Sequence, residues 1–201
     1  MVLMTKHVHE HHNLENEENF KRMVAVLDGE ERKQLLPAEK IISYLPDLVG
    51  KTIFDGGAGT GFLTLPLAKQ AEKVIAFDQS EKMLDLIQER AAKEKLENIT
   101  SMSGDIKTID LPDNSVDAAI VSVMIHEVHP FQDVLQELAR IIKPKGQFVI
   151  VEFESVTSHE NGGHRIPSQV MKKGIEELHL PIIKQTIPAE GMYLFIVGKN
   201  S

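Results

Sequence analysis

The spacing of apolar residues changes character near residue 50 of this chain. Before that point they recur at intervals of three and four residues, as in amphipathic helices. The positions are Leu14, Met23, Val24, Leu27, Leu35, Leu36, Ile41, Ile42 and Leu45. The pattern predicts two helices between residues 14 and 45, broken around Asp28–Gly29, with a further candidate break at Pro37.

From residue 52 onward, short apolar runs alternate with longer amphipathic segments. This alternation is typical of βα units that build a parallel sheet. The predicted strands are 52–54, 74–77, 99–102, 118–123 and 147–153, and the predicted helices between them are 62–70, 82–95 and 131–142.

The last 35 or so residues break this rhythm. A helical segment at 168–179 is followed by two predicted strands, 182–187 and 193–197, which are joined by residues 188–191 alone. A parallel crossover needs a dozen or more residues, so these two strands should be antiparallel. The sequence therefore predicts an α/β fold with a seven-stranded, mostly parallel sheet whose last strand is antiparallel.

Composition narrows the functional classes. The 201 residues suit one compact unit, with residues 1–48 as an N-terminal tail and helices that cover the site and residues 49–201 as the main domain. A net charge of −8 disfavours nucleic acid as a partner. No apolar run is long enough for membrane insertion. Because the chain has no cysteine and no secretory signal, we expect a cytoplasmic location. We expect a monomer or a homodimer.

A glycine-rich segment, Asp-Gly-Gly-Ala-Gly-Thr-Gly at 55–61, lies between a predicted strand and a predicted helix. Glycines here allow a tight turn, a close approach of the backbone to a ligand, and helix N–H groups that point at it. Asp78 follows the next strand, where a carboxylate can accept hydrogen bonds from both hydroxyls of a ribose. The pattern predicts a site for a nucleotide-like cofactor.

The spacing of the glycines discriminates between cofactors. A dinucleotide loop reads G-x-G-x-x-G, whereas this chain has G-x-G-x-G with Phe62 where the last glycine would fall. Asp55 brings a carboxylate into the loop, which suits an ammonium group better than a phosphate. A ligand with an adenosine end and an amino acid end fits these residues best.

Residues 55–61 and 77–80 resemble two motifs of the class I S-adenosylmethionine-dependent methyltransferases, and 104–106, 116–120 and 138–146 resemble further motifs in the same order. The resemblance covers about residues 50–155. It implies a Rossmann-like three-layer sandwich that binds S-adenosylmethionine and releases S-adenosylhomocysteine. The cofactor-binding residues that it implies are Asp55, Gly57, Ala58, Gly59, Asp78, Gln79, Met83, Gly104, Asp105 and Ile106. Lys145 replaces a glycine usual in the family, which should alter that turn but not the site.

The flanking segments 12–45, 126–130 and 164–166 resemble a group of small stand-alone members related to the menaquinone and ubiquinone methyltransferases. That group usually has Gly-Pro-Pro before the last of these segments, where this chain has Asn-Gly-Gly at 161–163. The resemblance favours a small-molecule acceptor. Arsenite is disfavoured, because related enzymes bind it through cysteines that this chain lacks.

His126 and His129 follow the fourth strand, at the edge of the sheet where ligands bind in open α/β folds. Each is a candidate proton acceptor for methyl transfer, with shaping of the pocket or capping of the next helix as the alternative. They do not form a zinc-binding H-E-x-x-H helix, because Pro130 stands where the second histidine would be. His164 and Arg165 could face an anionic acceptor or form an exposed helix entry.

Two further groups of residues have a functional and a plain interpretation. The histidines at 7, 9, 11 and 12 could bind a metal, but their alternate spacing favours a solvated tail, and we predict no metal. Met4, Met23, Met124 and Met171 could line an apolar acceptor pocket or belong to the core.

We therefore expect a methyltransferase that acts on a small molecule. Its competitors are a noncatalytic S-adenosylmethionine-binding regulatory protein and, as a third alternative, a nicotinamide-dependent oxidoreductase.

Overall fold

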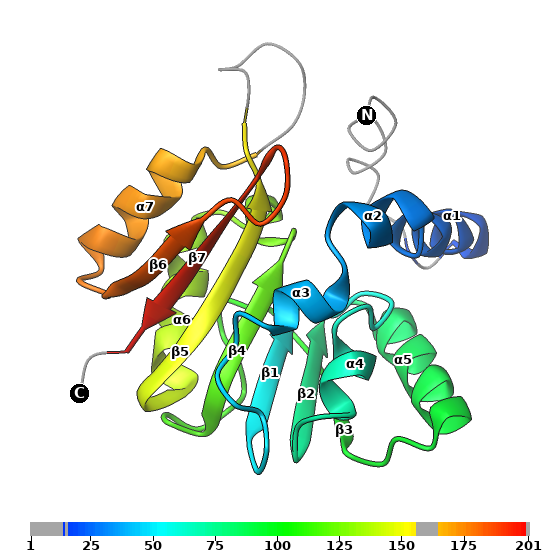
Figure 1. The fold of residues 1–201 in the computed structure, drawn as a ribbon. Coiled ribbons are helices and arrows are strands. Elements are labelled where there is room, and N and C mark those ends of the chain that lie inside the picture. The colour runs from blue at the N-terminus through cyan, green and yellow to red at the C-terminus, as the bar shows by residue number, and fades with distance from the viewer. Residues whose placement is uncertain (1–13, 15, 156–164, 200–201) are drawn as a thin grey trace.

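The computed structural model describes residue 14 and residues 16–155 and 165–199, and these form one twisted sheet with helices on both faces (Figure 1). The sheet has the order β3-β2-β1-β4-β5-β7-β6. Every pairing is parallel except those of β7 with β5 and with β6, so the predicted antiparallel last strand is confirmed. The strands are β1 Thr52–Gly56, β2 Lys73–Asp78, β3 Ile99–Ser103, β4 Val116–Ser122, β5 Ile142–Phe153, β6 Ile182–Thr186 and β7 Met192–Gly198.

The helices form two layers, which makes the predicted three-layer sandwich. On one face lie α3 (Ala38–Ile42), α4 (Thr64–Ala68) and α5 (Glu81–Glu94), and on the other lie α6 (Phe131–Ile141) and α7 (Ser168–Glu177). Because both faces are covered, the central strands are apolar on both sides: all seven residues of β7 are buried, and so are four of the five in β1. Among the described residues, no helix is long and apolar enough to cross a membrane.

The N-terminal segment forms three helices rather than two, because the chain breaks at Pro37 as well as at Asp28–Gly29. The first two are α1 (Glu17–Leu27) and α2 (Glu30–Leu35). Asn16 caps α1 by accepting hydrogen bonds from the N–H groups of Glu18 and Asn19. Residues of α3 belong to the same core as the sheet, whereas α1 and α2 lie beyond the carboxyl ends of β1 and β2 (Figure 1).

Two elements differ in length from their prediction. The helix predicted at 62–70 is the five-residue α4, because the glycine-rich turn extends to Leu63. Strand β5 begins at Ile142 instead of residue 147, with a shift in its register against β4. Within it Lys145 has φ +65°, a left-handed conformation in which a glycine has no steric cost.

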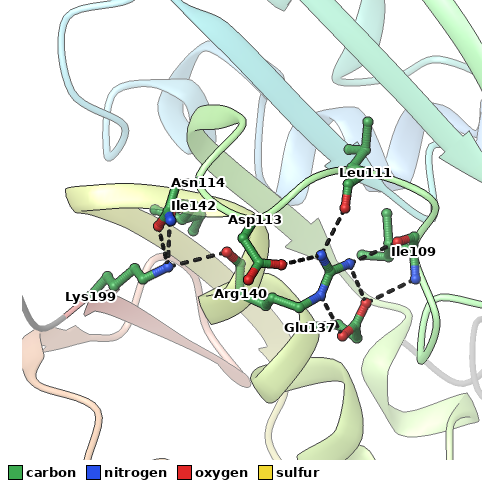
Figure 2. Close-up of polar contacts among 8 residues, drawn as sticks. All are labelled: Ile109, Leu111, Asp113, Asn114, Glu137, Arg140, Ile142 and Lys199. Atoms are coloured by element: carbon green, nitrogen blue, oxygen red, sulfur yellow. Dashed lines mark hydrogen bonds and ion pairs between the residues drawn. The ribbon is translucent and has the colours of Figure 1, made fainter.

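The end of the sheet opposite to α1 and α2 is fixed by the side chain of Arg140 on α6 (Figure 2). Its guanidinium donates hydrogen bonds of 2.7–2.8 Å to the carboxylates of Glu137 and Asp113 and to the carbonyls of Ile109 and Leu111. These bonds hold the connection between β3 and β4 against α6. The cluster lies at the amino-terminal end of β4, so its role is structural.

Candidate cofactor and acceptor site

A cavity of about 860 Å³ opens at the carboxyl ends of β1 to β4 and is lined on its far side by residues of α1 and α2. Cavities of this size hold drug-sized ligands. The sheet brings together residues that are distant in the sequence, because parallel strands end at the same edge. Nine of the ten residues predicted to bind the cofactor line the cavity: Gly57, Ala58, Gly59, Asp78, Gln79, Met83, Gly104, Asp105 and Ile106.

The turn after β1 presents its backbone to this cavity. Gly57 has φ +71°, and a Cβ atom added there would lie 2.7 Å from Cγ of Met124, so both conformation and space require glycine. The N–H groups of Gly57 and Ala58 donate to the carbonyl of Phe77, at 2.8 and 2.9 Å. The turn is therefore held by β2, the neighbouring strand.

Asp78, at the end of β2, has a second contact that the sequence did not indicate. One carboxylate oxygen accepts a hydrogen bond from the N–H of Gly59 at 2.8 Å, and the other accepts from the N–H of Ser80 at 2.9 Å. The carboxylate thus connects the glycine-rich turn to the start of α5. This fixes its orientation toward the cavity, which is what recognition of a ribose requires.

Asp55 is the one predicted cofactor-binding residue that does not line the cavity. It lies inside β1, is 2% exposed, and accepts a hydrogen bond of 2.6 Å from the hydroxyl of Thr64. Burial raises the pKa of Asp55 to about 6, although the hydrogen bond from Thr64 and the charge of Arg32 act in the opposite direction. The structure therefore places this carboxylate under the turn, outside the lining of the cavity.

Arg32 of α2 lines the cavity. The sequence indicates this residue only as part of the segment 12–45, which resembles the small stand-alone methyltransferases. Its guanidinium carbon lies 4.7 Å from the centre of the Phe62 ring, and its Nη1 donates to the carbonyl of Leu27 at 3.4 Å. Burial lowers the pKa of Arg32, while the charges of Asp55 and Asp28 raise it. Arginine stays charged at any physiological pH, so the wall of the cavity carries a cation here.

A separate ion pair connects α1 to the glycine-rich turn. Arg90 of α5 donates to both carboxylate oxygens of Asp28, at 2.6 and 3.2 Å, and to the carbonyl of Thr60 at 2.8 Å. Bidentate pairs of this kind fix geometry as well as adding energy. The N-terminal helices are therefore held in place over the cavity.

The end of β4 forms the opposite wall of the cavity, with Ser122, Val123, Met124, Glu127, Val128 and His129. Val123 has φ +57°, which is unusual for a β-branched residue and marks local strain of the kind found at functional sites. Its N–H donates to the carbonyl of Val151 at 2.8 Å, so β5 holds the chain in this conformation.

The structure separates the two histidines that the sequence grouped. His129 lines the cavity, whereas His126 does not and is 9% exposed. The Nδ1 atom of His126 lies 3.0 Å from Oε2 of Glu152, a buried carboxylate on β5, and its Nε2 atom lies 3.8 Å from Oε1 of Glu127. Burial alone lowers the pKa of His126, but the hydrogen bond with Glu152 and the charges of Glu152 and Glu127 raise it above the usual value.

Glu152 is a residue that sequence reasoning missed. It lies within an apolar run that reads as an ordinary buried strand, and a charged residue in such a run is the only signal that could have found it. A buried carboxylate must be paired, which in this fold is the role of His126.

The other candidates have different positions. Arg165 stacks on Phe153, with 4.8 Å between its guanidinium carbon and the ring centre, and Phe153 in turn lines the cavity. Met23 and Met124 line the cavity, whereas Met171 of α7 belongs to the hydrophobic core. His164, Met4 and the N-terminal histidines lie outside the described residues. Within the described ranges, no group of three or more histidines, aspartates or glutamates could hold a metal ion.

Comparisons with known proteins agree with this geometry. A family model described as methyltransferase domain matches residues 54–150. The demethylmenaquinone methyltransferase of Corynebacterium efficiens is 35% identical over 106 residues, which cover 53% of this chain and 43% of the relative. The chain spans less than half the length of the curated relatives that it matches.

Solved structures share the fold. A SAM-dependent methyltransferase from Aquifex aeolicus has a TM-score of 0.79 and 23% identity, with 89% of this chain and 97% of that chain covered. The [4+2]-cyclase SpnF has a TM-score of 0.74 and 14% identity, with 81% of this chain and 79% of that chain covered. At these identities the likeness shows the architecture alone. The two proteins are named for different reactions, methyl transfer and cyclisation, so one architecture serves more than one chemistry.

Proposed function

We propose that the chain transfers the methyl group of S-adenosylmethionine to a small molecule, because residues 54–150 match a methyltransferase domain and the fold is shared with the solved methyltransferase structures to which the chain is similar. The observation that carries the proposal is that nine residues predicted to bind this cofactor share one cavity, whose wall from α1 and α2 is apolar except for Arg32. The cofactor supplies an electrophilic methyl group on a sulfonium, and the chain has to bind, orient and desolvate the reactants.

Each part of the cavity has a role in this proposal. Asp78 accepts hydrogen bonds from the ribose hydroxyls, and Met83 packs on the adenine ring. Asp105 and Ile106 meet the adenine amino group through side chain and backbone. The turn with Gly57, which lines the cavity and has no room for a side chain, lies against the amino acid end of the cofactor in this proposal.

The acceptor side of the cavity favours an uncharged or weakly charged, largely apolar molecule. Its wall includes Met23 and Leu27 of α1, Met124 after β4, and Phe153 and Met192 of the last strands. Methionine side chains adapt to differently shaped apolar ligands. Curated relatives named for a demethylated menaquinone support an apolar ring as a first class of acceptor to test.

The test combines binding with turnover. Titration calorimetry of the chain should show binding of S-adenosylhomocysteine and no binding of NAD, and the reverse result would refute the proposal in favour of an oxidoreductase. A screen of small apolar acceptors for release of S-adenosylhomocysteine should then give turnover. Cofactor binding without turnover on any acceptor would support the alternative, a noncatalytic regulatory protein.

We further propose that one histidine accepts the single proton that the acceptor loses: either His129, which lines the cavity, takes it directly, or the carboxylate of Glu127 takes it and passes it to Nε2 of His126. If His126 acts as a base, kcat should rise with pH as its imidazole loses a proton, with a midpoint above the ordinary histidine value, because the pKa of His126 is raised. Glu152→Gln removes the buried charge and should lower that midpoint while leaving KM for the cofactor unchanged. A pH profile of His126→Ala and His129→Ala that matches the unmodified protein would remove both residues from the chemistry.

A further inference from the structure

Arg32 is a cation in the wall of the cavity whose hydrogen-bonding capacity is largely unused. Within the described part of the chain it forms no ion pair, and its hydrogen bond to the Leu27 carbonyl is long, at 3.4 Å. The two nearby carboxylates are engaged elsewhere, since Asp28 pairs with Arg90 and Asp55 accepts from Thr64. In the described part of the chain, most N–H groups of this partly buried guanidinium have no protein acceptor, so they are available to a ligand that supplies one.

The position of Arg32 along the cavity follows from its neighbours. It stacks on Phe62, which directly follows the glycine-rich turn, and it contacts the carbonyl of Leu27. A Cβ atom added at Gly59 would lie 3.3 Å from Cδ1 of Leu27, so this part of the N-terminal helices lies directly on the turn after β1. Arg32 therefore lies over the carboxyl end of β1.

The residues that would bind adenosine lie on the other side of that turn. Asp78 follows β2 and Asp105 follows β3, which is the edge strand of the sheet. An extended ligand with its adenosine at β2 and β3 has its opposite end at β1 and β4, under Arg32. Another cation in the wall, Lys107, lies at the adenosine side, 3.8 Å from the carboxylate of Asp105.

We propose that Arg32 binds the carboxylate at the amino acid end of the methyl donor. The planar fork of a guanidinium matches a carboxylate with two parallel hydrogen bonds, and stacking on Phe62 keeps its edge available for them. The N-terminal helices then take part in binding the donor, in addition to covering it. This inference rests on the proposed function, because it takes S-adenosylmethionine as the ligand of the cavity.

The test uses two ligands that differ by the carboxylate alone, S-adenosylhomocysteine and its decarboxylated analogue, with affinities measured by calorimetry. Arg32→Gln should weaken S-adenosylhomocysteine by roughly 10- to 100-fold, the range for a hydrogen-bonded charge pair, and should change the affinity for the analogue less than about threefold. Arg32→Lys keeps the charge but not the fork, so its loss should be intermediate. Lys33→Gln is the matched control: Lys33 is the next residue on α2, half-exposed and paired with Glu30, and its removal should affect neither ligand.

Each other outcome overturns the inference. Equal weakening of both ligands by Arg32→Gln would mean that Arg32 only supports the packing of α2, and thermal melting of the variant would show the same loss. Unchanged affinity for both ligands would place the carboxylate elsewhere, and a raised KM for an anionic acceptor would then assign Arg32 to that acceptor. No binding of S-adenosylhomocysteine by the unmodified protein would instead refute the proposed function itself.

Discussion

Replacing Gly57 by alanine is expected to lower the affinity for S-adenosylhomocysteine by at least about 100-fold, or roughly 2.7 kcal/mol. The new methyl group would lie 2.7 Å from Cγ and 2.9 Å from Cβ of Met124, and Met124 also lines the cavity. Either the turn or the Met124 side chain must move into the space of the ligand. Calorimetry with the purified variant measures the loss.

Two matched variants separate this collision from backbone strain. Gly191 has nearly the same φ, +70°, and no atom within 4 Å of an added Cβ. Gly191→Ala should therefore cost about 1 kcal/mol of stability and leave the affinity unchanged. Met124→Ala introduced into the Gly57→Ala variant should restore part of the affinity, because it removes the atoms that collide. A Gly57→Ala variant that binds as tightly as the unmodified protein would show that the turn does not contact the ligand.

The second large effect concerns Asp55, whose burial raises the pKa of its carboxyl from 3.8 to about 6. A group whose pKa is higher in the folded state keeps its full contribution to stability below the unfolded pKa and loses it as the pH rises through the folded pKa. The folded state should therefore lose about 3 kcal/mol from this group between roughly pH 4 and pH 7. Asp55→Asn does not titrate, so its stability relative to the unmodified protein should increase by up to that amount over this range.

Urea unfolding at several pH values measures this difference, and Asp117→Asn provides a control of opposite sign. Burial acts to raise the pKa of Asp117, but hydrogen bonds from the N–H of Thr52 and from Lys143 lower it overall. Its contribution is present at neutral pH and is lost as the pH falls, so the relative stability of Asp117→Asn should decrease with rising pH. If the stability difference for Asp55→Asn is independent of pH, its carboxyl is not buried as the structure shows.

Local patterns predicted the features that depend on a few neighbouring residues. The seven strands follow from short apolar runs, and the antiparallel last strand follows from a connection too short for a crossover. The candidate helix break at Pro37 is present, but the prediction failed at the edges of elements, as in the late start of α4 at Thr64 and the early start of β5 at Ile142. Helix and strand ends depend on which backbone groups find partners in the folded chain, and a local pattern does not contain that information.

The candidate site was only partly predictable, for a related reason. Gly57 and Asp78 stand out because a turn and a strand end restrict which residues fit there. The sequence assigns Asp55 to the ligand because its position next to the glycines is visible there. The sequence does not show the direction of its side chain, which in the structure is buried. In a sheet covered on both faces, alternation of side chains does not tell which face meets a cavity.

The sequence by itself determined the order of strands and helices along the chain, the turn that requires glycine, and the match of residues 54–150 to a methyltransferase domain. Only the tertiary structure decided which charged groups act together. Glu152 pairs with His126 from 26 residues away, and Arg32 reaches from α2 to Phe62 in the turn after β1. Such pairs form when strands and helices far apart in the chain are brought to one edge of the sheet, so their energies arise from packing and leave no periodic signal in the sequence.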